Sequence, residues 1–249
     1  MDELYRLSLF SPMSIKIPNE VYELVVADAW RFHYVKNGKS NISGFLNDLI
    51  PSMVKYKEDS FCQISSITKL EDDLLKPYIN AAVSLDYHQL SLIKDSGTNI
   101  TFRINKSRIN DFIDIYDKHL SAFNISFSSL VRNSLTEFAT KRLLIRERLA
   151  FFKQFKQIAF AIQEQQSCFT ILKDTTIHFL PLKIITSPFS DLNTIFGINI
   201  PEKKIISIPL CNIIAVSHKE NRLTVSDNVR ESLQHKIDLF FNDEKNKIK

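Results

Sequence analysis

The feature that most constrains the fold is a short alternating segment that runs directly into a helical pattern. Residues 99–104 (NITFRI) alternate between polar and apolar side chains, and a helical pattern with apolar Ile109, Phe112, Ile113 and Tyr116 on one face follows, to about Leu120. Alternation predicts a strand with one polar face. A lone strand leaves its backbone N–H and C=O groups without partners, so this strand needs a second one.

An earlier part of the chain offers that second strand. Residues 13–18 (MSIKIP) also alternate, and residues 19–35 follow with an apolar stripe at helical spacing, with Asn19 as the predicted N-cap behind Pro18. A turn (KNGKSN) and a second helical pattern over residues 42–54 come next. Pro51 lies inside this second helix, so we expect a kink or an early end there.

The two regions are similar to each other in sequence. Residues 43–53 align without gaps with residues 128–138, an offset of 85, and Lys16 aligns with Arg103 at an offset of 87. This self-similarity indicates a duplicated strand–helix–helix unit, whose second copy ends in a longer helical pattern over residues 127–152. Two such units can pair their strands as an antiparallel ribbon over four helices, either within one chain as a pseudo-dimer or between two chains.

Pairing of the strands would separate apolar from polar side chains. Ile15, Ile17, Phe102 and Ile104 would pack on the helices, and the polar side chains would share one exposed surface, here named the ribbon face: Ser14, Lys16, Asn99, Thr101 and Arg103. Arg or Lys can donate to guanine O6 and N7, while Asn and Thr can contact adenine or thymine edges. The alternative is an amphipathic edge strand without a ligand.

This arrangement resembles the ribbon-helix-helix family of DNA-binding proteins, whose paired strands enter the major groove. The resemblance implies that the ribbon face contacts bases. It also implies that the N-terminus of each second helix holds a backbone phosphate. The residues at those turns are Asn41 and Ser43 in the first copy, and Ser126 and Ser128 in the second.

The residue pattern changes along the rest of the chain. Most of residues 55–96 look helical, with a break at Pro77, whereas residues after about 176 form short β-branched or alternating segments that end in a helix over residues 228–242. We therefore predict an α+β protein with four parts: a first ribbon-helix-helix unit (1–54), a helical linker (55–96), a second unit with an extended basic helix (97–156), and a β domain with a C-terminal helix (157–249).

The C-terminal part resembles the WYL domain, an SH3-like β fold found in bacterial regulators and CRISPR accessory proteins. The similarity covers residues 179–198 and 205–216, in which Asn193 and Gly197 match the family's central segment, while Pro209 and Asn212 stand where arginines are usual. The resemblance implies a ligand pocket that includes Lys183 and Asn193. The order of parts is similar to that of WYL accessory proteins of type VI CRISPR systems, which bind single-stranded RNA and stimulate an RNA-guided RNA nuclease.

A basic segment joins the two parts. It contains Arg142, Arg146, Lys153 and Lys156, and phenylalanines 151, 152 and 155 alternate with these cations. One interpretation is a groove in which bases stack on aromatic rings. The other, which we favour for the phenylalanines, is a helix whose rings belong to the core.

The chemistry-bearing motifs of common enzymes are missing from the sequence. It has no P-loop, no G-x-S-x-G and no C-x-x-C, and its three cysteines are far apart. We therefore expect a non-enzymatic protein without a metal or cofactor. No uninterrupted apolar run approaches the ~18 residues of a membrane helix, so we expect a cytoplasmic protein.

Two nucleic-acid-related functions remain open for a chain with a net charge of +4, and a purely protein-binding module is the third class, preferred if no nucleic acid binds at low salt. The first is a transcription regulator that binds duplex DNA through the ribbon face. The second is an accessory protein that binds single-stranded RNA, or an RNA-guided CRISPR nuclease, and modulates its activity. A homodimer is compatible with both.

Overall fold

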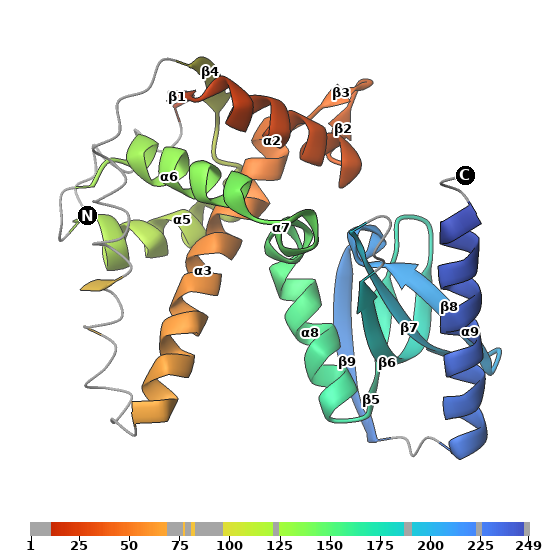
Figure 1. Cartoon of the computed structure of the whole chain (residues 1–249). Coiled ribbons are helices and arrows are strands. Elements are labelled where there is room, and N and C mark those ends of the chain that lie inside the picture. The colour runs from red at the N-terminus through yellow and green to blue at the C-terminus, as the bar shows by residue number, and fades with distance from the viewer. Residues whose placement is uncertain are drawn as a thin grey trace. The chain divides into compact units, whose positions relative to one another are not determined.

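The computed structural model describes residues 11–68, 77, 81–82, 97–121, 125–186, 191–222 and 226–246. Contacts divide the chain into two compact units, Met1–Lys141 and Arg142–Lys249, and each is described by itself (Figure 1). The fold is α+β, as the sequence predicts. The boundary after Lys141 lies inside the third predicted part, residues 97–156. Most of the helical pattern predicted for residues 69–96 lies outside the described residues.

The first unit consists of a two-stranded ribbon, a short hairpin and the helices around them. Its described elements are β1 (Met13–Ile17), α2 (Asn19–Arg31), β2 (Val35–Lys36), β3 (Lys39–Ser40), α3 (Ile42–Thr68), β4 (Thr98–Phe102), the 3-10 turn η1 (Lys106–Arg108), α5 (Ile109–Ile115), the π-helical turn η2 (Tyr116–Leu120) and α6 (Phe127–Thr140).

The predicted ribbon forms, and it forms within one chain. β1 and β4 pair antiparallel, with Ile15 opposite Ile100 and Ile17 opposite Thr98 (Figure 1). The side chains predicted to point inward are all at most 3 % exposed: Ile15, Ile17, Phe102 and Ile104. The helices therefore provide the apolar surface that a two-stranded ribbon needs on one face.

Two local expectations in the first copy, an early end of the second helix at Pro51 and an N-cap at Asn19, are wrong. α3 does not end at Pro51 but continues to Thr68, because apolar side chains on both sides of the proline are buried, including Leu49 and Met53. Asn19 is not the N-cap of α2. It is the first helical residue, and its side-chain oxygen accepts a hydrogen bond from Thr98 Oγ1 at 2.7 Å, so it holds the start of β4 instead.

The long helix predicted over residues 127–152 is interrupted twice. α6 ends at Thr140, where the Thr140 hydroxyl donates to the Glu137 carbonyl and Lys141 N–H donates to the Phe138 carbonyl, and Lys141 is extended. The second interruption is at Phe151, which separates α7 (Leu143–Ala150) from α8 (Phe152–Gln163). The predicted basic helix is therefore not continuous.

The second unit is an antiparallel sheet of five strands in the order β8-β7-β6-β5-β9. α8 packs against β5, β6 and β9, and the C-terminal helix packs against β7 and β8 (Figure 1). The elements that follow α8 are β5 (Gln166–Ile171), β6 (Thr176–Thr186), β7 (Asn193–Asn199), β8 (Lys204–Pro209), the 3-10 turn η4 (Leu210–Asn212), β9 (Ala215–Arg222) and α9 (Asp227–Asn246).

Gly197 marks a close approach inside this sheet. It lies opposite Pro181, next to a register shift in β6, and a Cβ at this position would overlap the Leu180 carbonyl and the Phe179 ring. Phe179 is fully buried. A residue with a side chain would force the strands apart here, which explains the glycine that also suggested the WYL resemblance.

Candidate nucleic-acid interface

The ribbon face is polar and exposed along its length. Ser14, Lys16, Asn99, Thr101 and Arg103 are all exposed, and Lys16 and Arg103 have no side-chain hydrogen bond or ion pair to any described residue. The register places Ser14 opposite Thr101 and Lys16 opposite Asn99. The two strands therefore present one continuous set of hydrogen-bonding groups with two positive charges that no described residue neutralises.

The ribbon has the internal symmetry that the sequence alignment implies. Ser14 and Thr101 occupy equivalent positions in the two copies, and they also face each other across the ribbon. A pseudo-twofold axis therefore passes between them. Lys16 and Arg103, the next equivalent pair, lie at opposite ends of the ribbon face.

Each second helix holds the strand of the other copy at an equivalent position. Asn47 of α3 donates to the Arg103 carbonyl at 2.9 Å, and Arg132 Nε of α6 donates to the Lys16 carbonyl at 2.9 Å. Asn47 and Arg132 are themselves 85 residues apart, which is the offset of the helix alignment. The two hydrogen bonds are therefore one contact repeated by the pseudo-symmetry, although the two side chains differ chemically.

Arg103 is held more firmly than Lys16. Its carbonyl also accepts from the Ser43 hydroxyl at 3.2 Å, and its N–H donates to the same hydroxyl at 3.3 Å. Asn47, which is 1 % exposed, accepts from Asn105 N–H at 2.8 Å. These hydrogen bonds fix the backbone of residues 103–105, from which the Arg103 side chain extends.

The predicted phosphate-binding turns are helix caps. The Asn41 side chain accepts from Gly44 N–H at 3.0 Å, and Ser126 Oγ accepts from Ser129 N–H at 3.1 Å, so each cap takes the amide of the third helical residue. The earlier amides are among those that a helix leaves unpaired. Ser128 Oγ lies 3.1 Å from Ser126 Oγ. Any anion at these turns would meet backbone amides rather than the cap side chains.

A neighbouring cation is already neutralised. Arg108 makes an ion pair with Asp48 of α3 and another with Asp111 at 3.2 Å. Tyr34 donates to the same Asp48 at 2.9 Å, and burial, together with this carboxylate, raises the pKa of Tyr34. Arg108 therefore links α5 to α3 and does not extend the positive charge of the ribbon face.

The residues of the predicted basic segment lie on two helices of the second unit. The side chain of Arg142, the N-cap of α7, is 73 % exposed and pairs with Asp191 at 3.1 Å, whereas Arg146 lies within α7. Lys153 and Lys156 are exposed on α8, and the Lys156 ammonium is 5.6 Å from the centroid of the Phe152 ring. Phe151 and Phe152 are 6 % and 8 % exposed and belong to the core, as we favoured, whereas Phe155 is only partly buried.

Asn193, predicted to line a ligand pocket, is a buried structural residue. Its side-chain amide donates to the Leu144 carbonyl at 3.0 Å and to Glu147 Oε2 at 2.7 Å. Its side-chain oxygen accepts from Arg148 Nε at 2.9 Å and from the Thr186 hydroxyl at 3.4 Å. The side chain therefore has no unused hydrogen-bonding group for a ligand. Lys183, on β6, is exposed.

Glu147, an acidic residue within the basic segment that was not among the predicted site residues, is the centre of that network. It is fully buried on α7 and also accepts from Asn193 N–H at 2.6 Å. Burial raises the pKa of Glu147 above its ordinary value, against the opposite effect of the hydrogen bonds from Asn193. Burial and the neighbouring Glu147 raise the pKa of the Cys211 thiol to about 12.

Two further observations limit the chemistry. Among the described residues, no group of three or more His, Cys, Asp or Glu side chains could hold a metal ion. Within the same part of the chain, no helix is long and apolar enough to cross a membrane.

Comparison with known proteins shows the fold and no more. No protein-family model matches the chain, and no curated protein matches it. A solved structure described as a CRISPR Cas-related protein superposes on 88 % of this chain with a TM-score of 0.59 and 16 % identity. This chain spans 65 % of that protein's length. The two chains therefore share a fold.

A second solved structure is less similar. Proteasome accessory factor B/C (PafBC) of Arthrobacter aurescens aligns with 88 % of this chain and 36 % of its own length, at 12 % identity and a TM-score of 0.29. That TM-score is too low to support an inference.

Proposed function

We propose that this protein is a non-enzymatic nucleic-acid-binding regulator that places its ribbon face in the major groove of duplex DNA. The main support is that two equivalent strands pair with their polar side chains exposed, and that the second helix of each copy holds the strand of the other. In this proposal the first unit is a ribbon-helix-helix pseudo-dimer formed within one chain, and the second is a WYL-like domain with a degenerate pocket.

The chemistry of the ribbon face suits a base-contacting surface. Arg103 can donate two hydrogen bonds to guanine O6 and N7, and Asn99 can pair with adenine N6 and N7. Ser14 and Thr101, at the centre of the ribbon face, can form hydrogen bonds to more than one kind of base. The unpaired amides at the N-termini of α3 and α6 would contact phosphates on either side, which fixes the position of the ribbon without adding sequence information.

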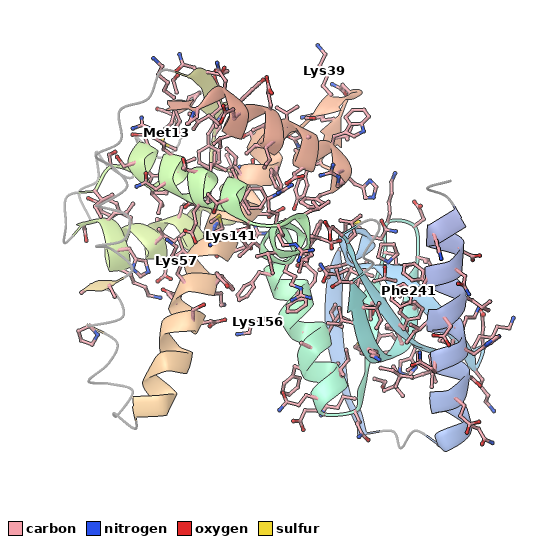
Figure 2. All side chains as sticks on the ribbon, viewed as in Figure 1. Met13, Lys39, Lys57, Lys141, Lys156 and Phe241 are labelled. Carbon is pink, nitrogen blue, oxygen red and sulfur yellow. The ribbon has the colours of Figure 1, made fainter. Side chains whose placement is uncertain are left out.

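The proposal is tested by comparing duplex DNA, single-stranded DNA and single-stranded RNA of one sequence at about 50 and 200 mM salt. We expect duplex DNA to bind tightest and its affinity to fall with salt. Lys16→Ala should weaken duplex binding, whereas Lys39→Ala should not. Lys39 is also an exposed lysine, on the β2–β3 hairpin, away from Met13 at the ribbon (Figure 2). Equal binding of all three nucleic acids, or equal effects of the two substitutions, would count against the ribbon.

A second candidate function follows from the fold shared with a CRISPR Cas-related protein. In it, the chain is an accessory protein that binds single-stranded RNA, or a CRISPR nuclease, through the second unit. It predicts that RNA binds tighter than duplex DNA, and that Lys153→Ala with Lys156→Ala weakens RNA binding while Lys16→Ala does not. Both candidates place the protein in the cytoplasm, and neither requires a homodimer.

A further inference from the structure

The two ends of the ribbon face differ chemically, although equivalent helix positions hold a carbonyl at each end. At one end Lys16 lies opposite Asn99. At the other end the last pair of the ribbon is Met13 and Phe102, and the next residues outward, Pro12 before β1 and Arg103 after β4, are both exposed. The pseudo-symmetry relates Lys16 to Arg103 and Pro12 to Asn99. Each end therefore combines one cation with a partner of a different kind: an amide at one end and an apolar ring at the other.

These differences correspond to different base preferences. Arg103 presents a planar fork that matches guanine, whereas Lys16 presents a single ammonium on a flexible chain. Asn99 can form a paired contact with adenine, but Pro12 has neither a hydrogen-bonding side chain nor a backbone N–H. The half-site under Arg103 and Pro12 should therefore contain guanine, and the half-site under Lys16 and Asn99 should contain adenine.

One backbone contact is common to both ends of the ribbon. Asn47 and Arg132 hold the Arg103 and Lys16 carbonyls at the same distance, 2.9 Å, from equivalent helix positions. Ser43 adds hydrogen bonds to the Arg103 backbone, so this end is held more firmly, and the outward side chains differ as well. Because both copies are in one chain, no second chain restores the symmetry of the contacts.

We propose that this chain binds a non-palindromic duplex DNA site in one fixed orientation, set by Arg103 and Pro12 at one end of the ribbon and by Lys16 and Asn99 at the other. The proposal rests on the function proposed above for the ribbon. A ribbon built from two identical strands would select a palindrome, because its two halves make the same contacts.

The experiment is selection of binding sites from a random duplex library with the full chain, followed by affinity measurements. We expect a non-palindromic motif with guanine in one half and adenine in the other. Two palindromes made by doubling each half should bind at least about fivefold more weakly than the selected site, since a mismatched base pair typically reduces affinity by that much or more. A palindromic motif from the wild-type chain would overturn this inference but leave DNA binding intact. No enrichment at all would overturn both.

A matched variant tests the cause. The triple substitution Pro12→Asn, Ser14→Thr and Lys16→Arg gives the first strand the same outward side chains as the second. All three positions are exposed, and circular dichroism checks that the fold is retained. Its selected motif should become palindromic, and the single substitution Lys16→Arg should shift the preference of one half-site toward guanine. An unchanged asymmetric motif from a folded triple variant, or from Lys16→Arg alone, would show that these side chains do not set the orientation.

Discussion

At the scale of single residues, the most informative pair is Asn47 and Arg132. Both donate to a strand carbonyl of the other copy, and both occupy the same place in the repeat. Asn47 is buried and makes several hydrogen bonds, whereas Arg132 is only partly buried. The same contact is therefore built from an amide in one copy and a guanidinium in the other.

We expect Asn47→Ala to lower the free energy of unfolding of the first unit by about 1–3 kcal/mol, because it leaves the buried partners of the amide unsatisfied. Arg132→Ala should cost less, about 1 kcal/mol or below, because water can replace its partly exposed bond. Urea unfolding followed by the fluorescence of Trp30, the only tryptophan, measures both. Asn110→Ala, an exposed asparagine on α5, is the control. An Asn47→Ala effect no larger than that of the control would show that the amide is not needed.

The inward and outward positions of the ribbon could be predicted from the sequence, because alternation in a strand directly reports its two faces. Asn47 and Arg132 could not be recognised in this way, since each is a polar residue within an apolar helical stripe. Their role depends on a carbonyl more than 50 residues away. The sequence signal for both residues is that Asn47 and Arg132 occupy the same position in the two aligned helices, 85 residues apart. That position alone does not indicate a hydrogen bond to a strand carbonyl.

In the second unit, Glu147 should make stability depend on pH. Its carboxyl has a higher pKa in the folded protein than the ordinary value of 4.5, so between these two pH values the folded state binds more protons than the unfolded state. The free energy of unfolding should therefore fall as pH rises through this interval. Glu147→Gln should remove that part of the slope, measured by urea unfolding under circular dichroism. Asp174→Asn, at an exposed carboxyl in the β5–β6 turn, should keep the wild-type slope. An unchanged slope in Glu147→Gln would contradict the assignment.

At the scale of elements, the ribbon depends on a close approach at its open end. A Cβ on Gly97, just before β4, would overlap the carbonyl oxygen of Ile17 at the end of β1. The glycine therefore lets the two strands meet at the register that the ribbon face requires.

We expect Gly97→Ala to destabilise the first unit by about 1–3 kcal/mol, the usual cost of overpacking, because backbone rather than a movable side chain occupies the space. Urea unfolding measures the change, and Asn99→Ala on the exposed face of the same strand is the control. If the two variants were equally stable, the strands would not be in close contact at Gly97.

The elements that the sequence misplaced have tertiary causes. α3 passes Pro51 because buried contacts on both sides, together with the Lys57–Glu137 ion pair at 2.7 Å further along, outweigh the lost helical hydrogen bond. β5 is not predicted from the sequence because its buried positions include polar residues and its exposed positions include apolar ones. Ser167 and Thr170 are buried, whereas Phe169 and Ile171 are exposed. The periodicity of apolar residues predicts the buried face of a strand only where the buried side chains are apolar, and here polar side chains are buried.

At the scale of the whole molecule, the chain consists of two compact units, and its only tryptophan lies in the first. We expect urea unfolding of the full chain to give different transitions by Trp30 fluorescence and by circular dichroism, because the second method reports both units. Asn47→Ala should shift the fluorescence transition, and Glu147→Gln should leave it unchanged. Coincident transitions that both variants shift together would show that the units unfold as one.

The central claim is that the ribbon face contacts bases in duplex DNA, and it is tested by the specificity of Arg103→Ala. The measurement is the ratio of the dissociation constants for random duplex and for the selected duplex. A paired contact to guanine contributes about 1–3 kcal/mol, so Arg103→Ala should reduce this ratio by about 5- to 150-fold. Lys39→Ala should leave the ratio at its wild-type value. If Arg103→Ala weakened binding to both duplexes equally and left the ratio unchanged, Arg103 would contact only phosphates, and the claim would be wrong.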